Sequence, residues 1–585
     1  HLRIFERTLA ILMKSLRLPH FPKSAFPTRL LSHLRALSPG DKIIASVLGL
    51  ALLILILAGL YTVERQFLVE VPSRGGGLVE GVVGSPRFIN PLLALTDTDR
   101  DLTSLTYAGL MGYDADRRLV PVLAEAYEVS EDGKTYTFKL RPNAVFTDHT
   151  PVTAEDVVFT VEKAQDAGLK SPEYANWANI RAEAVDARTV RFVLPKPYAP
   201  FLEDATLGVL PAHLWRSTSN EEFPFSPLME EPVGAGPFKV SRIIRDKSGI
   251  AKQYELSAFG DYALQKPYLS SLTFVFFKTE EELRDALTRG RVESAYGVPS
   301  ATALRTPYSR VFGVFLNGSQ NPLFARIEVR KALSIAVDRT ALVQDVLGGY
   351  GTPLDGPVPP SIGASIPPPD SFEDPIAEAR GVLERNGWKF DEEAHVFKQA
   401  KEGLELRVTL KTSNVPELKA TAEALRADWE KLGVPVELEF FSPSDLATEV
   451  IRPRKYDALL FGMVIGRDRD LFAFWDSSQR SDPGLNIALY ASRAVDALLE
   501  KMRTEREDAA IQKDLVELDT LISADYPAVF THAPDFVYTV PENLRGVSIG
   551  AIAAPTDRLV NAAFWYRRTE AVWPALAPTR SGTSQ

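Results

Sequence analysis

Two kinds of hydrophobic periodicity alternate along the chain. The clearest helical spacing, with apolar residues three or four positions apart, is formed by Leu418, Ala422, Leu425, Trp429 and Leu432. Gly433 follows as a typical helix end, and the alternating residues of VPVELEFF then predict a strand. Because units of this kind build sheets that are covered by helices, the pattern predicts a mixed α/β architecture.

Strand-like and helical segments follow one another from residue 78 onward without an internal repeat. YEVSEDGKTYTFKLR predicts a β-hairpin, because EDGK supplies a turn between two alternating runs. TAEDVVFTVEKAQDAG predicts a helix. Strands are also predicted for LVEGVVG, ARTVRFVL and KQYELSAF, and SLTFVFFKTEEELRDALTRGRV predicts a strand followed by a helix that ends at Gly290.

One apolar segment is much longer than the others. The run from Ile43 to Val63 is uncharged and has about the 20 residues that a helix needs to cross a bilayer. Eight Lys or Arg residues precede it against only two acidic ones, so the positive-inside rule places its N-terminal side in the cytoplasm. A cleaved signal peptide is the alternative, but the run exceeds the usual apolar region of such peptides. We therefore expect a cytoplasmic basic segment at 1–41, a transmembrane helix at 42–63 and a tether at 64–77.

Composition limits the classes of function. The 585 residues carry a net charge of −10, which argues against nucleic acid as the main partner, because phosphate binding needs a basic surface. Cysteine is absent, so disulfides, thiol nucleophiles and zinc–thiolate sites are excluded. The stretch GTPLDGPVPPSIGASIPPPDSFED predicts a long loop or linker, and residues 573–585 predict a disordered tail.

A polar cluster stands out in FTDHTPVTAEDVVF, where Asp148, His149, Glu155 and Asp156 lie close together. A metal site would need further ligands, since only one imidazole is present and the spacing matches no common ligand set. Helix initiation explains more of the residues. Thr153 is a typical N-cap, and the two acidic residues after it lie where the helix dipole favours negative charge. We therefore predict a capped helix start.

The sequence offers little for other site chemistries. GAGPFKV, at residues 234–240, lacks both the Lys-Ser/Thr of a phosphate-binding loop and the dinucleotide pattern. No Gly-x-Ser-x-Gly or His-Glu-x-x-His motif occurs. A hydrolase that uses two carboxylates stays open as an alternative, since such residues need no fixed spacing in the sequence.

Several segments, in order along the chain, are similar to one protein family. FTDHTPVTAEDVVFTVEKA resembles the signature segment of the extracellular solute-binding proteins of family 5, the oligopeptide- and dipeptide-binding receptors of bacterial ABC importers. His149 stands where that family commonly has Gly. Other family-like segments are GVVGSPRFINPLLALTDTDRDLTSLTYAGLMGYD, GAGPFKV, FARIEVRKALSIAVDR and GGYGTPLDGPVPP. The resemblance extends from about Gly77 to about Val547.

The resemblance implies an α/β, two-lobed fold of the type II periplasmic-binding-protein kind, with an extra subdomain and with the ligand enclosed between the lobes by hinge closure. It implies no catalytic residue, no cofactor and no metal. The implied parts are lobe 1 at 78–311 with the subdomain at about 103–190, lobe 2 at 312–534, and a return to lobe 1 at 535–572.

The resemblance also implies where the ligand lies. Leu95, Thr96 and Asp97 would form the first-lobe strand that runs along a bound peptide. The facing second-lobe segment is FGMVIGRDRDLFAFW, with the candidates Phe461, Gly462, Met463, Val464, Ile465, Gly466, Asp468, Asp470 and Trp475.

The second-lobe segment departs from the family pattern at one position. Peptide-binding relatives commonly have an aspartate there that pairs with the ligand's α-ammonium, and this chain has Gly466. Either Asp468 or Asp470 replaces that aspartate, or the ligand lacks a free amine, or both aspartates belong to a solvated loop. Phe472 and Trp475 are candidates for a cleft wall or for the core.

The implied function is that of an extracytoplasmic substrate-binding protein that holds peptides as an added strand and delivers them to the permease of an ABC importer. We expect a monomer whose partners are a peptide ligand, the permease subunits and, through the N-terminal helix, the cell membrane. A nickel chelate or an oligosaccharide is the alternative ligand in the same fold.

Overall fold

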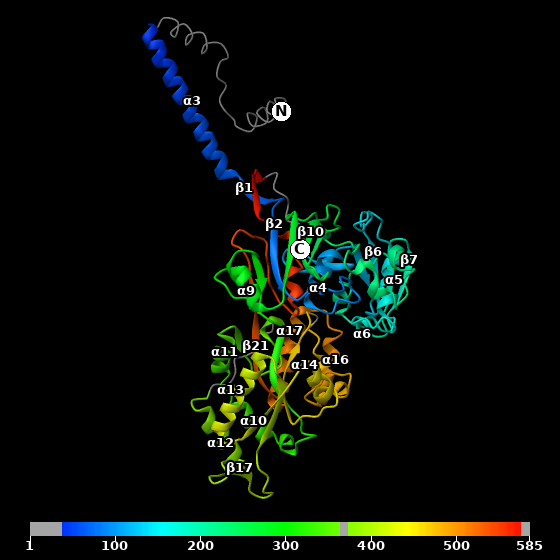
Figure 1. Ribbon diagram of the computed structural model, residues 1–585, viewed down its shortest axis with the longest axis vertical. Helices are drawn as coiled ribbons and strands as arrows, with labels where there is room; N and C mark the ends of the chain where they lie inside the picture. The colour runs from blue at the N-terminus through cyan, green and yellow to red at the C-terminus, as the bar shows by residue number, and fades with distance from the viewer. Residues whose placement is uncertain (1–37, 363–371, 468, 575–585) are drawn as a thin grey trace. The chain divides into compact units, whose positions relative to one another are not determined.

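The computed structural model describes residues 38–362, 372–467 and 469–574. Most of the predicted basic segment 1–41, most of the predicted tail 573–585, and Asp468 lie outside the described residues. The chain divides into two compact units (Figure 1). The first includes helix α3, ends at Val71 and resumes at Thr569, and the second runs from Pro72 to Arg568.

Helix α3 spans Pro39–Phe67, so a helix is present over the predicted range 42–63 and extends beyond it at both ends. No helix in the described part of the chain is both long enough and apolar enough to cross a membrane. The helical part of the transmembrane prediction is therefore confirmed, and its membrane-spanning part is not supported. The predicted tether 64–77 contains the end of α3 and strand β1 (Val69–Ser73), which pairs with β22 (Arg568–Val572).

A mixed sheet of twelve strands forms the framework of the second unit. In spatial order the main strands are β19 (Val436–Phe441), β18 (Val408–Ser413), β20 (Ala458–Val464), β14 (Arg310–Leu316), β21 (Ala528–Thr539), β12 (Ser294–Tyr296), β2 (Gly77–Val83), β11 (Ser271–Phe277), β10 (Ala251–Ala258) and β9 (Phe238–Arg245). Strands β13 (Ala303–Pro307) and β15 (Gly351–Pro353) also pair with β21. The first part of β21 pairs with β14 and its last part with β12 and β13, so this strand joins the two halves of the sheet.

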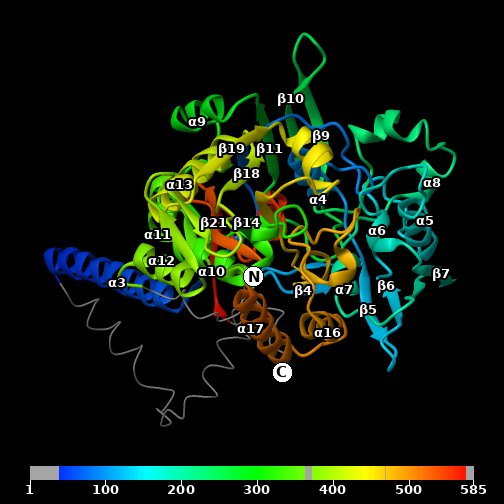
Figure 2. The ribbon, with the colours of Figure 1, turned by 90° about the horizontal axis from the view of Figure 1, so that it is seen from below.

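Helices cover both faces of the half-sheet that contains β14, β18 and β20. In β20, Leu460 belongs to one hydrophobic core, whereas Leu459 and Met463 belong to another. This is expected because alternate side chains of a strand point to opposite faces. The first core includes residues of α10 (Ile327–Ile335), α11 (Arg339–Leu347), α12 (Pro375–Arg385) and α13 (Pro416–Leu432). The second includes residues of α16 (Arg493–Met502) and α17 (Asp508–Asp525), which Figure 2 shows apart from α11, α12 and α13.

The other half of the sheet packs against α4 (Asp97–Thr106) and α9 (Glu280–Thr288). Its core contains a fully buried arginine, Arg558, whose Nη2 lies 2.6 Å from the Asp101 carboxylate and whose Nε lies 3.0 Å from that of Glu80. A buried charge is tolerated only when it is paired and hydrogen-bonded, which this arrangement provides.

A separate four-stranded sheet forms the subdomain. Its strands, in spatial order, are β5 (Ala124–Val129), β6 (Thr135–Leu140), β8 (Thr189–Val193) and β7 (Arg181–Asp186), and α5 (Ala154–Ala164) packs on it. The predicted hairpin is confirmed as β5 and β6, with Gly133 in the turn at a φ of 68°. The subdomain's buried core runs from Leu92 to Ala235, which is wider than the predicted range 103–190.

The other predicted elements are also found. The helix with apolar residues at 418–432 is α13, and Gly433 ends it with a φ of 101° that favours glycine. The predicted strand after it is β19. The remaining strand predictions correspond to β2, β8, β10 and β11, and the predicted helix before Gly290 is α9.

Candidate ligand-binding site

Strand β20 brings four of the predicted site residues to a cavity of about 630 Å³: Phe461, Gly462, Met463 and Val464. The rest of the wall comes from Ala447, Ile451, Arg452, Arg454, Phe474, Asp482, Pro483, Gly484, Leu485 and Ile487. The volume falls within the range of pockets that hold small ligands. The guanidinium of Arg454 makes its hydrogen bonds within the protein, because it donates to the carbonyl oxygens of Ile451, Arg480 and Gly484. Four contiguous residues of the predicted set therefore line one cavity.

A side chain at position 462 would collide with the neighbouring strand. Gly462 pairs with Phe312 of β14, and a Cβ at 462 would lie 2.7 Å from Cε1 of that ring. The Phe312 ring stacks on His532 of β21, with ring centroids 5.0 Å apart. Burial lowers the pKa of His532 to about 4, so the imidazole is neutral near pH 7. Gly462 thus leaves room for an aromatic stack beside the cavity.

The segment after β20 runs back into the protein and carries a buried cation. Ile465 is fully buried, and its N–H donates to the carbonyl oxygen of Ser309 at 2.9 Å. Nη2 of Arg467 lies 3.1 Å from Oδ1 of Asp557, and Cζ of Arg467 lies 4.4 Å from the ring centroid of Tyr113. Burial by itself would lower the pKa of Arg467, but the Asp557 carboxylate raises it. Arg467 therefore stays charged and ties this segment to two distant parts of the chain.

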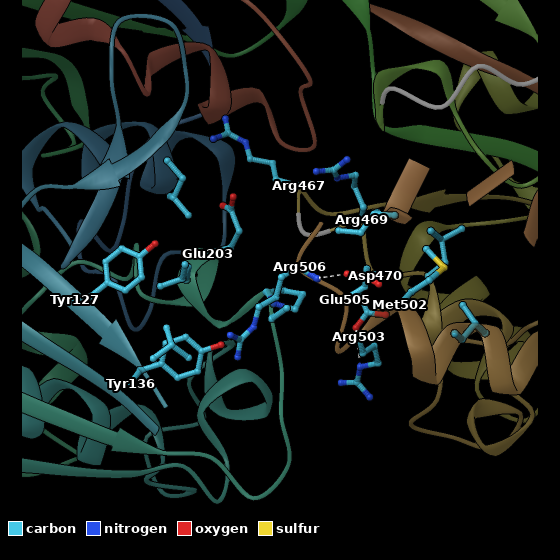
Figure 3. A pocket seen from close by; sticks show the side chains of 18 residues that line it. Tyr127, Tyr136, Glu203, Arg467, Arg469, Asp470, Met502, Arg503, Glu505 and Arg506 are labelled. Atoms are coloured by element: carbon cyan, nitrogen blue, oxygen red, sulfur yellow. Dashed lines mark hydrogen bonds and ion pairs between the residues drawn. The ribbon is translucent and has the colours of Figure 1, made fainter. Parts of the chain in front are cut away.

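A second cavity, of about 540 Å³, lies between the subdomain and the segment after β20 (Figure 3). One side is formed by Leu119, Tyr127, Val129, Tyr136, Ala199, Pro200, Leu202 and Glu203. The other side is formed by Arg467, Arg469, Asp470, Leu471, Leu499, Met502, Arg503, Glu505, Arg506 and Ile511. Figure 3 shows Tyr127, Tyr136 and Glu203 across the cavity from Arg469 and Asp470. Asp470 is the predicted site residue that this cavity contains.

The carboxylate of Asp470 is engaged by the protein itself. It accepts a hydrogen bond from the N–H of Phe472 at 2.9 Å, and Nε of Arg503 lies 3.1 Å from it. Burial raises the pKa of Asp470, although both of these contacts lower it. The Arg503 guanidinium also lies over the ring of Phe472, 4.5 Å from its centroid. Arg503 thus makes a cation–π contact with Phe472 and a salt bridge with Asp470.

Of the two alternatives for Trp475, the structure supports the core, so its assignment to the ligand site is not supported. Its side chain is fully buried in the core beneath α16 and α17, with its ring centroid 5.8 Å from that of Phe530 and 6.1 Å from that of Tyr490. Helix α15 (Phe472–Trp475) turns the indole inward, away from both cavities. A large aromatic ring gains more by such burial than by lining a wet cleft.

The predicted strand at Leu95, Thr96 and Asp97 is also not found. Leu95 is in a loop with 58% of its surface exposed, Thr96 is the N-cap of α4, and Asp97 is the first residue of that helix. The cause is a capping box, in which the Thr96 hydroxyl accepts from the N–H of Asp99 at 3.1 Å and the Asp99 carboxylate accepts from the N–H of Thr96 at 3.1 Å. None of the three residues lines either cavity.

The polar residues of the signature segment do not converge on one site, because each contacts a different partner. Thr153 is the N-cap of α5, and Asp156 accepts from its N–H at 2.8 Å, so the predicted helix start is confirmed. Asp148 pairs with His213 at 2.9 Å, and His149 lies 3.4 Å from Asp261. His149 has a φ of 68°, the left-handed conformation that glycine adopts most readily, which fits the glycine that the resemblance implied at this position. In the described ranges, no three His, Asp or Glu residues converge as a metal site.

Sequence reasoning missed most residues of the second cavity. The missed polar residues are Tyr127, Tyr136, Glu203, Arg467, Arg469, Arg503, Glu505 and Arg506. They come from segments up to several hundred residues apart, and only Arg467 and Arg469 lie in the segment singled out from the sequence. The one available signal was the concentration of arginines around residues 467–469 and 503–506.

Comparison with known proteins gives a consistent set of relatives. Residues 118–483 match the sequence profile of "Bacterial extracellular solute-binding proteins, family 5 Middle". The chain is 26% identical over 501 residues to the oligopeptide-binding protein AppA of Bacillus subtilis, a match that covers 81% of this chain and 89% of that protein. It is 26% identical to the probable D,D-dipeptide-binding periplasmic protein DdpA of Escherichia coli, which covers 80% of this chain and 90% of DdpA.

A solved structure has the same fold. The ABC transporter substrate-binding protein CtaP from Listeria monocytogenes superposes with a TM-score of 0.70 at 24% identity. The match covers 85% of this chain and all of that structure. The likeness supports the mixed α/β fold expected from the sequence.

Proposed function

Because the chain belongs to the bacterial extracellular solute-binding proteins of family 5, we propose that it binds peptides and delivers them to the membrane permease of an ABC importer. The relatives named for oligopeptide and D,D-dipeptide binding favour a peptide over other solutes. The observation that carries the proposal is the pair of cavities lined by β20 and by the segment after it.

The peptide backbone would lie along the end of β20. Val464, the last residue of the strand, has 45% of its surface exposed and lines the first cavity. An extended peptide can add to such a strand end through backbone hydrogen bonds, while adjacent cavities receive alternate side chains. The candidate residues for this contact are Phe461, Gly462, Met463, Val464, Ile465 and Gly466.

We assign the lobes as residues 78–311 with 535–572, and 312–534. The buried cores support this division, since one core combines Leu78 and Phe274 with Phe536 and Trp565. Two other cores contain buried residues almost entirely from within 312–534. Closure of these lobes around a ligand is the motion that a permease would recognise.

The extracytoplasmic location follows the family, whereas attachment to the membrane is proposed from the sequence alone. Its basis is the uncharged run from Ile43 to Val63 after a basic segment. Alkaline carbonate extraction of membranes that contain the full chain tests it. The protein should stay in the membrane pellet, and its release into the supernatant would end the attachment proposal without affecting peptide binding.

Binding without turnover separates this function from a carboxylate-pair hydrolase. The purified protein is incubated with a defined peptide mixture, and both its scattering radius and the intact peptides are followed. We expect the radius to decrease while every peptide keeps its mass. Disappearance of peptides with the appearance of fragments would contradict the proposal.

A further inference from the structure

We propose that the cavity between the subdomain and α16–α17 binds the terminal carboxylate of the ligand through Arg469 and Arg506. This inference rests on the proposed peptide-binding function and adds the chemical group that the cavity selects. It does not concern the cavity beside β20.

Arginines outnumber acidic side chains in the wall of this cavity. Its wall contains four arginines against the three acidic residues Glu203, Asp470 and Glu505. Arg467, Arg469 and Arg503 are paired with Asp557, Asp508 and Asp470, so among the described residues Arg506 is the wall arginine without an acidic partner. An anionic group entering here would meet guanidinium groups in a protein whose net charge is −10.

Each acidic residue of the wall already accepts hydrogen bonds from the protein. Glu203 accepts from the hydroxyl of Tyr113. Asp470 is held by Arg503 and by a backbone N–H. The side chain of Glu505 accepts from the N–H groups of Arg506 at 2.8 Å and of Glu507 at 3.0 Å. The wall therefore offers an incoming ligand few free acceptors.

The donors are less fully engaged. Within the described part of the chain, Arg506 has no salt bridge and no side-chain hydrogen bond, and its guanidinium lies near Gly133 of the subdomain hairpin. Arg469 pairs with Asp508 at 2.7 Å, but the Asp508 side chain is 72% exposed. Exposed pairs of this kind contribute little, so a ligand carboxylate can compete for Arg469. Guanidinium groups also match the planar geometry of a carboxylate.

The rest of the wall indicates what carries the carboxylate. Apolar side chains such as Leu202, Leu499 and Met502 line the cavity together with the rings of Tyr127 and Tyr136. A wall that combines apolar side chains and aromatic rings with guanidinium groups suits a terminal residue with an apolar or aromatic side chain and a free carboxylate. A volume of about 540 Å³ accommodates such a group.

The test uses two pools of synthetic octapeptides that lack Asp and Glu, one with free C-termini and one with C-terminal amides. Affinities are measured by calorimetry for the wild type, for Arg506→Gln and for the matched control Arg284→Gln, an exposed arginine on α9 outside both cavities. We expect the wild type to prefer the free acids by about tenfold, because a charge-assisted hydrogen bond contributes on the order of 1.5 kcal/mol or more. R506Q should reduce that preference at an unchanged melting temperature, and R284Q should keep it.

The outcomes distinguish failure of the carboxylate site from failure of the proposed peptide-binding function. Equal affinity of the wild type for acids and amides, or a preference that persists in R506Q and in Arg469→Gln, would overturn the carboxylate site while leaving peptide binding in place. Failure of both pools to bind would overturn the proposed function, and the carboxylate site with it.

Discussion

The guanidinium of Arg467 lies 3.1 Å from the carboxylate of Asp557, and the two side chains are only 15% and 13% exposed. One residue follows strand β20 and the other belongs to the part of the chain that returns after β21. The pair therefore fixes the segment between the two cavities to a distant part of the fold.

Removing one partner of this pair should destabilise the protein. Arg467→Met removes the salt-bridge partner of the largely buried Asp557 carboxylate, although the N–H groups of Ala553 and Ala554 still donate to it and the Arg117 guanidinium still attracts it. We expect the free energy of unfolding to fall by about 1–3 kcal/mol in urea titrations. Asp116→Asn, which breaks the contact of a 76% exposed carboxylate with Arg118, is the control and should change it by less than about 0.5 kcal/mol. An R467M protein as stable as the control would show that the pair contributes nothing.

Asp519 gives the protein a defined pH dependence. Burial raises its pKa to about 6, while the N–H of Val358 donates to its carboxylate at 3.2 Å and lowers the pKa. The nearby Asp355 carboxylate raises it further. Because the folded state binds this proton more tightly than the unfolded state, the contribution of Asp519 to stability is lost as the pH rises from about 4 through about 6.

Asp519→Asn should remove that loss, because the amide oxygen still accepts from Val358 and carries no charge. We expect D519N to raise the free energy of unfolding by about 2 kcal/mol at pH 8 and by much less at pH 4.5. Thermal unfolding at a series of pH values measures the difference. A gain that does not depend on pH would contradict the assignment of the effect to this carboxyl.

Gly462 should tolerate no side chain. Gly462→Ala places a methyl group against Phe312 and disturbs its stack on His532. We expect a loss of about 1–3 kcal/mol in the free energy of unfolding, typical of an overpacked core. Gly260→Ala is the matched control, since a Cβ there meets nothing closer than 3.8 Å. If both variants unfold at the same urea concentration, the close approach of β14 and β20 does not constrain this position.

The ligand's amine should matter little. Gly466 offers no carboxylate, and Asp470 is paired with Arg503, so neither supplies a free acceptor for an α-ammonium group. We expect N-acetylated and free peptides of the same sequence to bind with affinities that differ by less than about threefold, or roughly 0.7 kcal/mol. Competition calorimetry with matched peptide pairs decides this. A large preference for the free amine would mean that another acceptor holds it.

Local chemistry made much of the fold predictable. Some helix signals lie within a short stretch of sequence. The apolar spacing of 418–432 followed by Gly433 predicts α13, and Thr153 followed by acidic residues predicts the start of α5. The same chemistry at Thr96 and Asp99 starts a helix where the resemblance implied a strand at 95–97. Trp475 could not be placed from sequence, because its burial depends on contacts with Phe315 and Phe530, far away in the chain.

The residues that line the cavities were predictable only where they are neighbours in the sequence. The residues of β20 are contiguous and lie in one segment that resembles the family, so they could be identified together. The wall of the second cavity is assembled from residues 119–203 and 467–511, and no spacing in the sequence links Tyr136 to Arg506. Only the packing of the subdomain against α16 and α17 creates that site.

Native mass spectrometry of the purified chain tests peptide binding most directly. We predict a noncovalent complex that releases one or more intact peptides when the protein is unfolded, and that regains them when peptides are added back at neutral pH. Release of a nickel chelate, an oligosaccharide or no solute at all, together with failure to take up any peptide, would contradict the account.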